Sequence, residues 1–201
     1  MIGQTIVFGC LTSNNGCMTI TQTDPSRRKY AVAALVGLIG GIISAIVKFG
    51  WEVPLPPRTP ERNATNPPQA LLEWLGMNPS VTHASYTFNG NTGLPWVSFL
   101  IHFGFSIAFA IIYCVIAERF PQIKLWQGVA FGLLVWVAFH VVFMPAIGIV
   151  PAPWDQPWQE HFSEIPGHMI WMWVIEIIRR DLRNRITHEP DAEFAPSTRT
   201  V

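Results

Sequence analysis

Three histidines lie inside long apolar stretches, where an ionisable side chain is costly and often functional. His102, His140 and His168 each interrupt a segment that is otherwise almost free of charge. Glu164 lies four residues before His168, so a helix would place both side chains on one face. These four residues are the first candidates for chemistry.

A layer of such groups suggests three kinds of chemistry. Unperturbed histidine and glutamate titrate near ~6.5 and ~4.3, so acidification would change the charge of the layer and favour a pH sensor, a proton-linked transporter or a channel. Alternatively, His102, His140 and His168 together with a carboxylate form a ligand set for a metal such as zinc in a membrane enzyme. No pair has the compact HExxH spacing of a zinc protease. The third possibility is a simple hydrogen bond from each histidine to a neighbouring helix. The predicted polar layer comprises His102, His140, His168, Glu164, Glu52 and Lys48.

The composition indicates a membrane protein. Half of the 201 residues are hydrophobic (50%) and only 13% are charged, against roughly 25% in soluble domains. The formal net charge is zero and there is no basic stripe, so nucleic-acid binding is not expected. Three cysteines do not form an even-numbered disulfide framework.

The sequence predicts an all-α integral membrane bundle of four transmembrane helices. The stretch "YAVAALVGLIGGIISAIVKFG" (30–50) crosses about 30 Å of hydrocarbon at about 1.5 Å per residue. The other spans are predicted at about 94–117, 125–150 and 162–179. The membrane domain would cover residues 27–186, after a flexible lead-in over 1–26 and before a tail over 187–201.

The distribution of basic residues predicts the orientation of the bundle. Short cytoplasmic loops accumulate Lys and Arg, and these residues gather before the first span, between the second and third, and after the fourth. Both termini are therefore expected in the cytoplasm, with 51–93 and 151–162 outside. In this orientation the three histidines lie roughly 9 to 15 Å below the outer boundary.

The longer outer loop has its own structural signals. The proline-rich "EVPLPPRTP" cannot continue a helix and favours an extended chain. Further on, Asn66 followed by two prolines predicts the start of a short helix on the outer membrane face. Asn89-Gly90 predicts a turn.

Two further groups of residues have predicted roles in packing and anchoring. Gly37, Gly41 and Ala45 lie four residues apart, a pattern that lets helices approach closely, either inside the bundle or in a homo-oligomeric scaffold. The arginines after the fourth span are candidates for contact with lipid headgroups. Glu176 is expected to pair with an arginine of its own helix, and Asp181 with Arg185. The candidate headgroup contacts are Arg179, Arg180, Arg183 and Arg185.

Three segments resemble a known family. "VKFGWEVPLPPRTP" (47–60), "YCVIAERFPQIKLWQG" (113–128) and "IEIIRRDLRNRITHEPD" (175–191) are similar to segments of the YagU family of bacterial inner-membrane proteins, in the same order. The resemblance covers roughly residues 27–191. It implies a multi-pass inner-membrane protein associated with survival in strong acid. It assigns no catalytic residue, and no cofactor is expected; the expected partners are the lipid bilayer and other copies of the chain.

Overall fold

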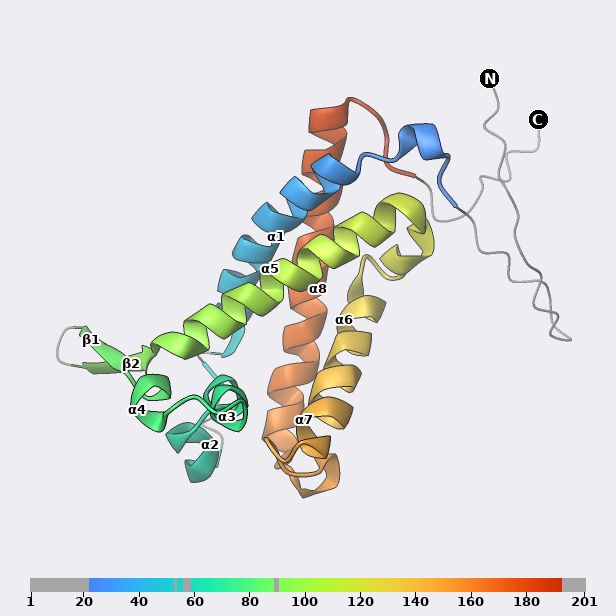
Figure 1. Ribbon diagram of the computed structural model, residues 1–201. Coiled ribbons are helices and arrows are strands. Elements are labelled where there is room, and N and C mark those ends of the chain that lie inside the picture. Colours follow the sequence, from blue (N-terminus) through green and yellow to red (C-terminus); the bar gives the residue numbers. More distant parts are fainter. Residues whose placement is uncertain (1–21, 53, 56–58, 89–90, 193–201) are drawn as a thin grey trace, which may run out of the picture.

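Four long helical segments form the body of the protein in the computed structural model, which describes residues 22–52, 54–55, 59–88 and 91–192 (Figure 1). They are α1 (Tyr30–Glu52), α5 (Trp96–Arg119), the consecutive segments α6, η3 and α7, and α8 (Trp158–Thr187). The third segment joins the α-helix α6 (Val129–Trp136), a π-helix η3 (Val137–Phe143) and the short α7 (Met144–Ala146). Most of the predicted lead-in over residues 1–26 lies outside the described residues.

Three of these segments are long and apolar enough to cross a membrane. They are Tyr30–Glu52, Trp96–Arg119 and Val129–Ala146, close to the first three predicted spans. The helix α8 extends well beyond the predicted fourth span, and most of its charged residues are buried against the other helices. These charged residues lower the mean hydropathy of α8 whether or not they are buried, so hydropathy alone does not identify α8 as a span.

Small residues allow α1 to pack tightly against α5. A Cβ atom added to Gly37 would lie 2.7 Å from the Cα of Ile111, and one added to Gly41 would lie 2.6 Å from the Cα of Ile107. Ala45 is fully buried on the same face. This face of α1 is therefore filled by α5 within the protomer, so it is not available for the oligomeric contact considered from the sequence.

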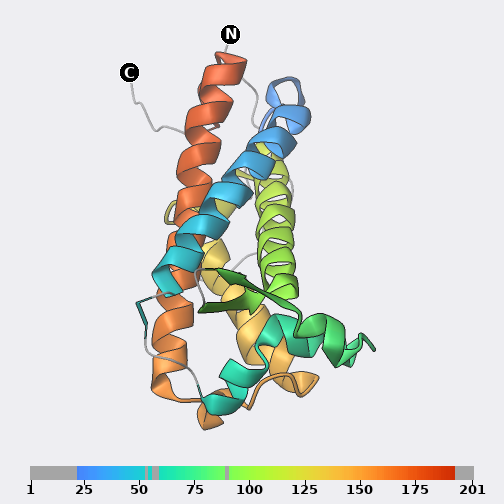
Figure 2. The same cartoon turned by 90° about the vertical axis from the view of Figure 1, so that its left-hand side faces the viewer.

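Four long segments meet around an aromatic and aliphatic core. The helix α1 packs along both α5 and α8, and α6 packs along α8. Figures 1 and 2 show the start of α1 and the end of α8 at one end of the bundle, and α2 to α4 at the other. The buried core comprises Ala33, Val36, Ala110, Tyr113, Cys114, Val135, Trp171, Met172 and Ile175.

The segment between α1 and α5 folds into short elements over one end of the bundle. They are α2 (Pro60–Ala64), α3 (Pro67–Trp74), α4 (Pro79–Thr82), β1 (Ser85–Phe88) and β2 (Asn91–Pro95). The predicted short helix is confirmed as α3: Asn66 accepts a hydrogen bond from the backbone N–H of Gln69, whose side chain accepts one from the N–H of Asn66. This capping box satisfies amide groups that a helix start leaves open.

A small β-hairpin corrects the all-α prediction. The strands β1 and β2 pair antiparallel, with Ser85 opposite Pro95 and Thr87 opposite Thr92. The predicted turn at 89–90 lies outside the described residues, as do residues 53 and 56–58 of the proline-rich stretch. Apolar and polar side chains alternate over Tyr86, Thr87 and Phe88 before Asn-Gly, a pattern that predicts a strand. The all-α prediction, based on the long apolar segments, did not include it.

Candidate functional site

A cavity of about 680 Å³ lies where α1, α5, η3 and α8 meet the short elements α2 and α3. Its wall is largely apolar, but eight ionisable side chains line it. All six residues of the predicted polar layer are among the residues that line this cavity. The ionisable lining residues are Lys48, Glu52, Arg62, His102, His140, Glu160, Glu164 and His168.

The carboxylate of Glu164 is the centre of this polar cluster. Its Oε2 atom lies 3.3 Å from Nζ of Lys48, 3.6 Å from Nε2 of His140 and 3.7 Å from Nδ1 of His168. Lys48 also forms an ion pair with Glu52, four residues further along α1. Three separate segments, α1, η3 and α8, thus bring ionisable groups to one carboxylate.

The two imidazoles next to Glu164 are oriented by the backbone around them. The Nδ1 atom of His168 lies 2.8 Å from the carbonyl oxygen of Glu164, so Nδ1–H donates and Nε2 is the ring atom left to bind or release a proton. The rings of His140 and His168 meet edge to face, with centroids 4.9 Å apart. His140 therefore senses both the carboxylate and the second imidazole.

Two local features bring His140 close to α8. The π-helix η3 carries His140, and a π-helical turn holds an extra residue that changes which side chains face a neighbour. Eight residues before His140, a Cβ atom at Gly132 would lie 2.4 Å from the carbonyl oxygen of His168, so only glycine allows this approach of α6 to α8. The π-helix ends before Pro145, which lies in α7.

His102 shares the cavity but makes a different contact. Its Nε2 atom lies 2.9 Å from the carbonyl oxygen of Ala45, so the imidazole donates a hydrogen bond to the backbone of α1. Its ring packs edge-on against Phe49 and Phe103. This is the hydrogen bond between helices that the sequence left open as an alternative for each histidine.

A buried ion pair at the cavity was not predicted. Arg62 of α2 lies 3.2 Å from Glu160 of α8, and their side chains are only 7% and 4% exposed. Arg62 belongs to residues 51–93, which the sequence predicted as a loop outside the membrane. A possible signal was the threonine-proline start of α2, because Thr59 caps the helix that holds Arg62 over the bundle.

The donor atoms of His140, Glu164 and His168 lie within 4.8 Å of one another, close enough to share a cation. The set differs from the metal set considered from the sequence, because His102 does not belong to it. Two imidazoles and a carboxylate suit zinc chemically. However, the ammonium of Lys48 is already 3.3 Å from the same carboxylate and supplies the positive charge that a metal would bring.

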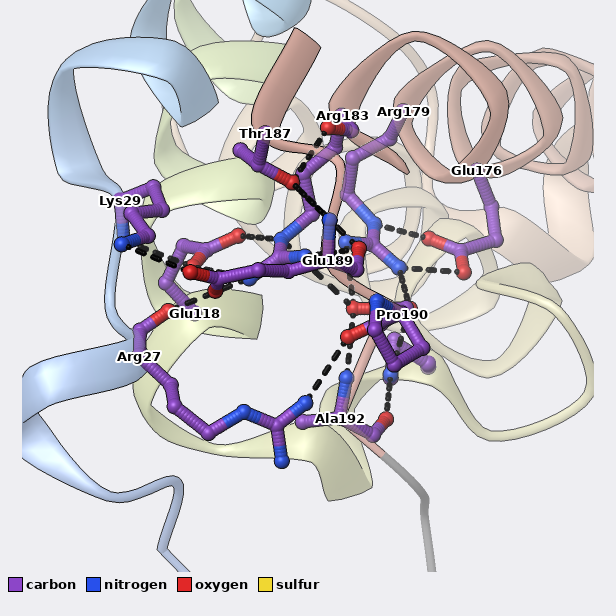
Figure 3. A network of polar contacts seen from close by, with 12 residues as sticks. Arg27, Lys29, Glu118, Glu176, Arg179, Arg183, Thr187, Glu189, Pro190 and Ala192 are labelled. Carbon is purple, nitrogen blue, oxygen red and sulfur yellow. Dashed lines mark hydrogen bonds and ion pairs between the residues drawn. The ribbon is translucent and has the colours of Figure 1, made fainter. Parts of the chain in front are cut away.

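A second polar cluster lies at the opposite end of the bundle (Figure 3). Arg179 binds Glu176, with 2.6 Å between Nε and Oε2, and also Asp191. Arg183 binds Glu118 of α5, with 2.6 Å between Nε and Oε1. Tyr113 donates a 2.9 Å hydrogen bond to Glu176. The predicted pairing of Glu176 with an arginine of its own helix is confirmed.

The four tail arginines occupy two different environments. Arg179 and Arg183 are each 1% exposed and face protein carboxylates, which leaves little surface for the predicted contact with headgroups. Arg180 is exposed, and Arg185 forms the predicted surface pair with Asp181 at 2.9 Å. Contact with headgroups stays a prediction for these last two arginines.

Asp191, in the chain after α8, forms ion pairs within this second cluster. Burial alone would raise the pKa of its carboxyl group, but the hydrogen bonds and positive charges of Arg179 and Lys124 outweigh burial and lower the pKa to about 2. Lys124, between α5 and α6, lies 2.8 Å from the carboxylate. The residue thus connects α8, the α5–α6 turn and the start of the tail.

Comparisons with known proteins agree with this architecture. Residues 42–177 match a family described as a protein of unknown function, DUF1440. The chain is 49% identical to the inner membrane protein YagU of Escherichia coli (strain K12) in a match that extends over 196 residues. The match covers 86% of this chain and 95% of that protein. No solved structure matches the chain. The chain therefore belongs to the DUF1440 family, the family of the inner-membrane protein YagU.

Proposed function

We propose that this protein is an inner-membrane protein of the acid response, in which the cluster around Glu164 binds protons when the outside becomes acidic. The cluster would act as a pH sensor or as the proton site of a transporter or channel. The observation that carries the proposal is the convergence of His140, His168 and Lys48 within 3.3 to 3.7 Å of one carboxylate oxygen. A histidine cluster changes charge in the pH range between neutrality and strong acid.

The charge of the cavity supports this response. Two cationic and three carboxylate side chains line it, so its formal charge is −1 while the three imidazoles are neutral. Protonation of His140 and His168 would raise that charge to +1, with both cations next to Lys48. Repulsion between like charges in a largely apolar cavity is strong enough to favour a different helix arrangement.

The π-helix η3 is the natural element to change. A π-helix is less favourable than an α-helix and occurs mostly at functional positions. Conversion of Val137–Phe143 to α-helical geometry would rotate His140 away from Glu164, whereas His168 would stay on α8. Proton binding would thus separate His140 from Lys48 and move the third span.

In the proposed topology α8 crosses the membrane as a fourth span, and both termini lie in the cytoplasm. Support comes from the lining of the cavity, which includes residues of α2 and α3. These elements lie at the end of the bundle opposite to the end of α8, which carries Arg179 and Arg183 (Figure 1). The basic residues gather at the latter end, as cytoplasmic ends do. The cavity would then open outward, where acid stress begins.

Survival in strong acid tests the proposal. We expect the double variant His140→Gln and His168→Gln to lose the protection that the natural chain gives, at equal abundance in the membrane. His102→Gln is the matched control, because its imidazole lines the same cavity but binds the Ala45 carbonyl. Unchanged survival of cells with the double variant would exclude the proposal, and equal loss in the control would indicate a structural role for all three histidines.

A further inference from the structure

We propose that the cavity binds a lipophilic organic cation of single charge, such as a quaternary ammonium or phosphonium compound, and that protons displace it. The inference rests on the proposed function, because the same carboxylate serves both the proton and the organic cation. It assigns a ligand class to a site for which the relatives' names give none. Three properties of the cavity carry it: size, wall chemistry and charge.

The size and the wall fit a bulky apolar body. A volume of about 680 Å³ lies within the range of about 300 to 1,000 Å³ that is typical of sites for small organic ligands. Aromatic rings from α1, α5, η3 and α8 line it, and the rings of Phe105 and Phe139 meet at 4.8 Å where α5 approaches η3. The aromatic lining residues are Phe49, Phe99, Phe105, Phe139, Phe143 and Trp171.

The charge of the cavity selects a cation over an anion. Glu52, Glu160 and Glu164 outnumber Lys48 and Arg62, so a single positive charge brings the cavity to neutrality while the imidazoles are neutral. The faces of aromatic rings attract cations that have shed their water, and quaternary ammonium groups are recognised in this way. A small hydrated metal ion or an organic anion would gain nothing from such walls.

Protonation and cation binding compete because they act on the same groups. The charged and titratable groups that face Glu164 come from α1 (Lys48, Glu52), α2 (Arg62), α5 (His102), η3 (His140) and α8 (Glu160, His168). One proton taken up by His140 or Glu164 removes the negative charge that the organic cation neutralises. Each proton bound from the acidic side therefore releases one cation, which is the stoichiometry of an exchanger.

Isothermal titration calorimetry with tetraphenylphosphonium on the purified full chain in detergent tests the inference. We expect binding at pH 8 and binding at least about tenfold weaker at pH 5, the effect of about one unit of charge. Tetraphenylborate, which has the same shape and the opposite charge, is the matched ligand and is expected not to bind at pH 8. Equal binding of both ions, or binding independent of pH, would overturn the inference and indicate partition into an apolar surface.

Two cavity variants should change this affinity in opposite directions. Glu164→Gln removes a negative charge and is expected to weaken tetraphenylphosphonium binding about tenfold, whereas Lys48→Met removes a positive charge and should strengthen it. Glu61→Gln, in the exposed part of α2, is the control without effect. Identical affinity in all three variants would place the ligand outside the cavity. Loss of acid protection in the histidine variants, without any phosphonium binding, would reject this ligand class and leave the proposed function intact.

Discussion

The Nε2 atom of His140 lies 3.6 Å from Oε2 of Glu164, although the two residues belong to different segments and are separated by the turn after α7. This approach depends on two local departures from ordinary helix packing: the π-helix that carries His140 and the glycine that lets α6 touch α8. The geometry is thus built into the backbone, and it can be tested through both the cluster and the packing that supports it.

The pair of Lys48 and Glu164 should show strong energetic coupling. Lys48→Met leaves a buried carboxylate without its nearest cation, and Glu164→Gln removes one of the two carboxylates that pair with the ammonium. We expect each single variant to lower the free energy of unfolding by about 1 to 3 kcal/mol, and the double variant to lose less than the sum of both. A double-mutant cycle of thermal unfolding in detergent measures this coupling. Strict additivity would show that the two side chains do not interact.

The buried pair of Arg183 and Glu118 should be among the strongest contributors to stability. Both side chains are almost completely shielded, at 1% and 2% exposure. Arg183→Met leaves the buried Glu118 carboxylate without its paired cation, although the backbone N–H of Lys29 still donates to it, at a cost of about 3 to 5 kcal/mol. Arg185→Met is the control, because its pair with Asp181 is exposed to solvent and contributes little. Thermal unfolding of the two variants tests this prediction. Equal melting temperatures would contradict it.

The pKa of Asp191 predicts how the stability of the second polar cluster, around Arg179 and Arg183, depends on pH. Because the folded pKa of about 2 is below the ordinary value of 3.8, the ionised form stabilises the fold. The contribution, about 2 kcal/mol, is fully present above pH 4 and is lost as the pH falls towards 2. Asp191→Asn should therefore lower stability at pH 7 and remove this part of the acid dependence. Parallel unfolding curves of variant and natural chain across this range would refute the assignment.

Tight packing of α1 on α5 predicts a large effect of one methyl group. Gly41→Ala would bring a Cβ atom to 2.6 Å from the Cα of Ile107, which the backbone of α5 can avoid only by moving. We expect a loss of about 1 to 3 kcal/mol in the free energy of unfolding. Gly104→Ala is the control, because no atom lies within 4 Å of the added Cβ and alanine favours the helix. Equal stability of the two variants would mean that the helices are not in contact.

Much of the arrangement follows from sequence patterns with simple physical causes. Long apolar runs predicted the first three spans, because a helix must hide its backbone amides from lipid. Spacing of four residues identified the glycine face of α1, the Glu164–His168 pair and the Asp181–Arg185 pair. The capping residue Asn66 predicted the start of α3.

Other features depend on contacts between distant segments, and no local pattern shows them. Glu118, Lys124 and Asp191 looked like ordinary surface charges, yet Glu118 and Asp191 bind buried arginines of α8 and Lys124 binds Asp191. Equal depth was sufficient to predict that the histidines share a layer, but depth does not specify the direction in which each ring points. His102 turned to the backbone of α1 because Ala45 leaves its carbonyl group accessible at close range.

None of the seven residues of η3 is fully buried, so hydrocarbon chains of the bilayer would touch the segment that presents His140. Thickness and lateral pressure of the surrounding lipid would therefore act directly on the balance between π-helical and α-helical geometry. Acid sensitivity measured in detergent micelles and in native lipid should then differ. A change in the lipid composition of the host membrane would therefore change the acid sensitivity of the protein without any mutation.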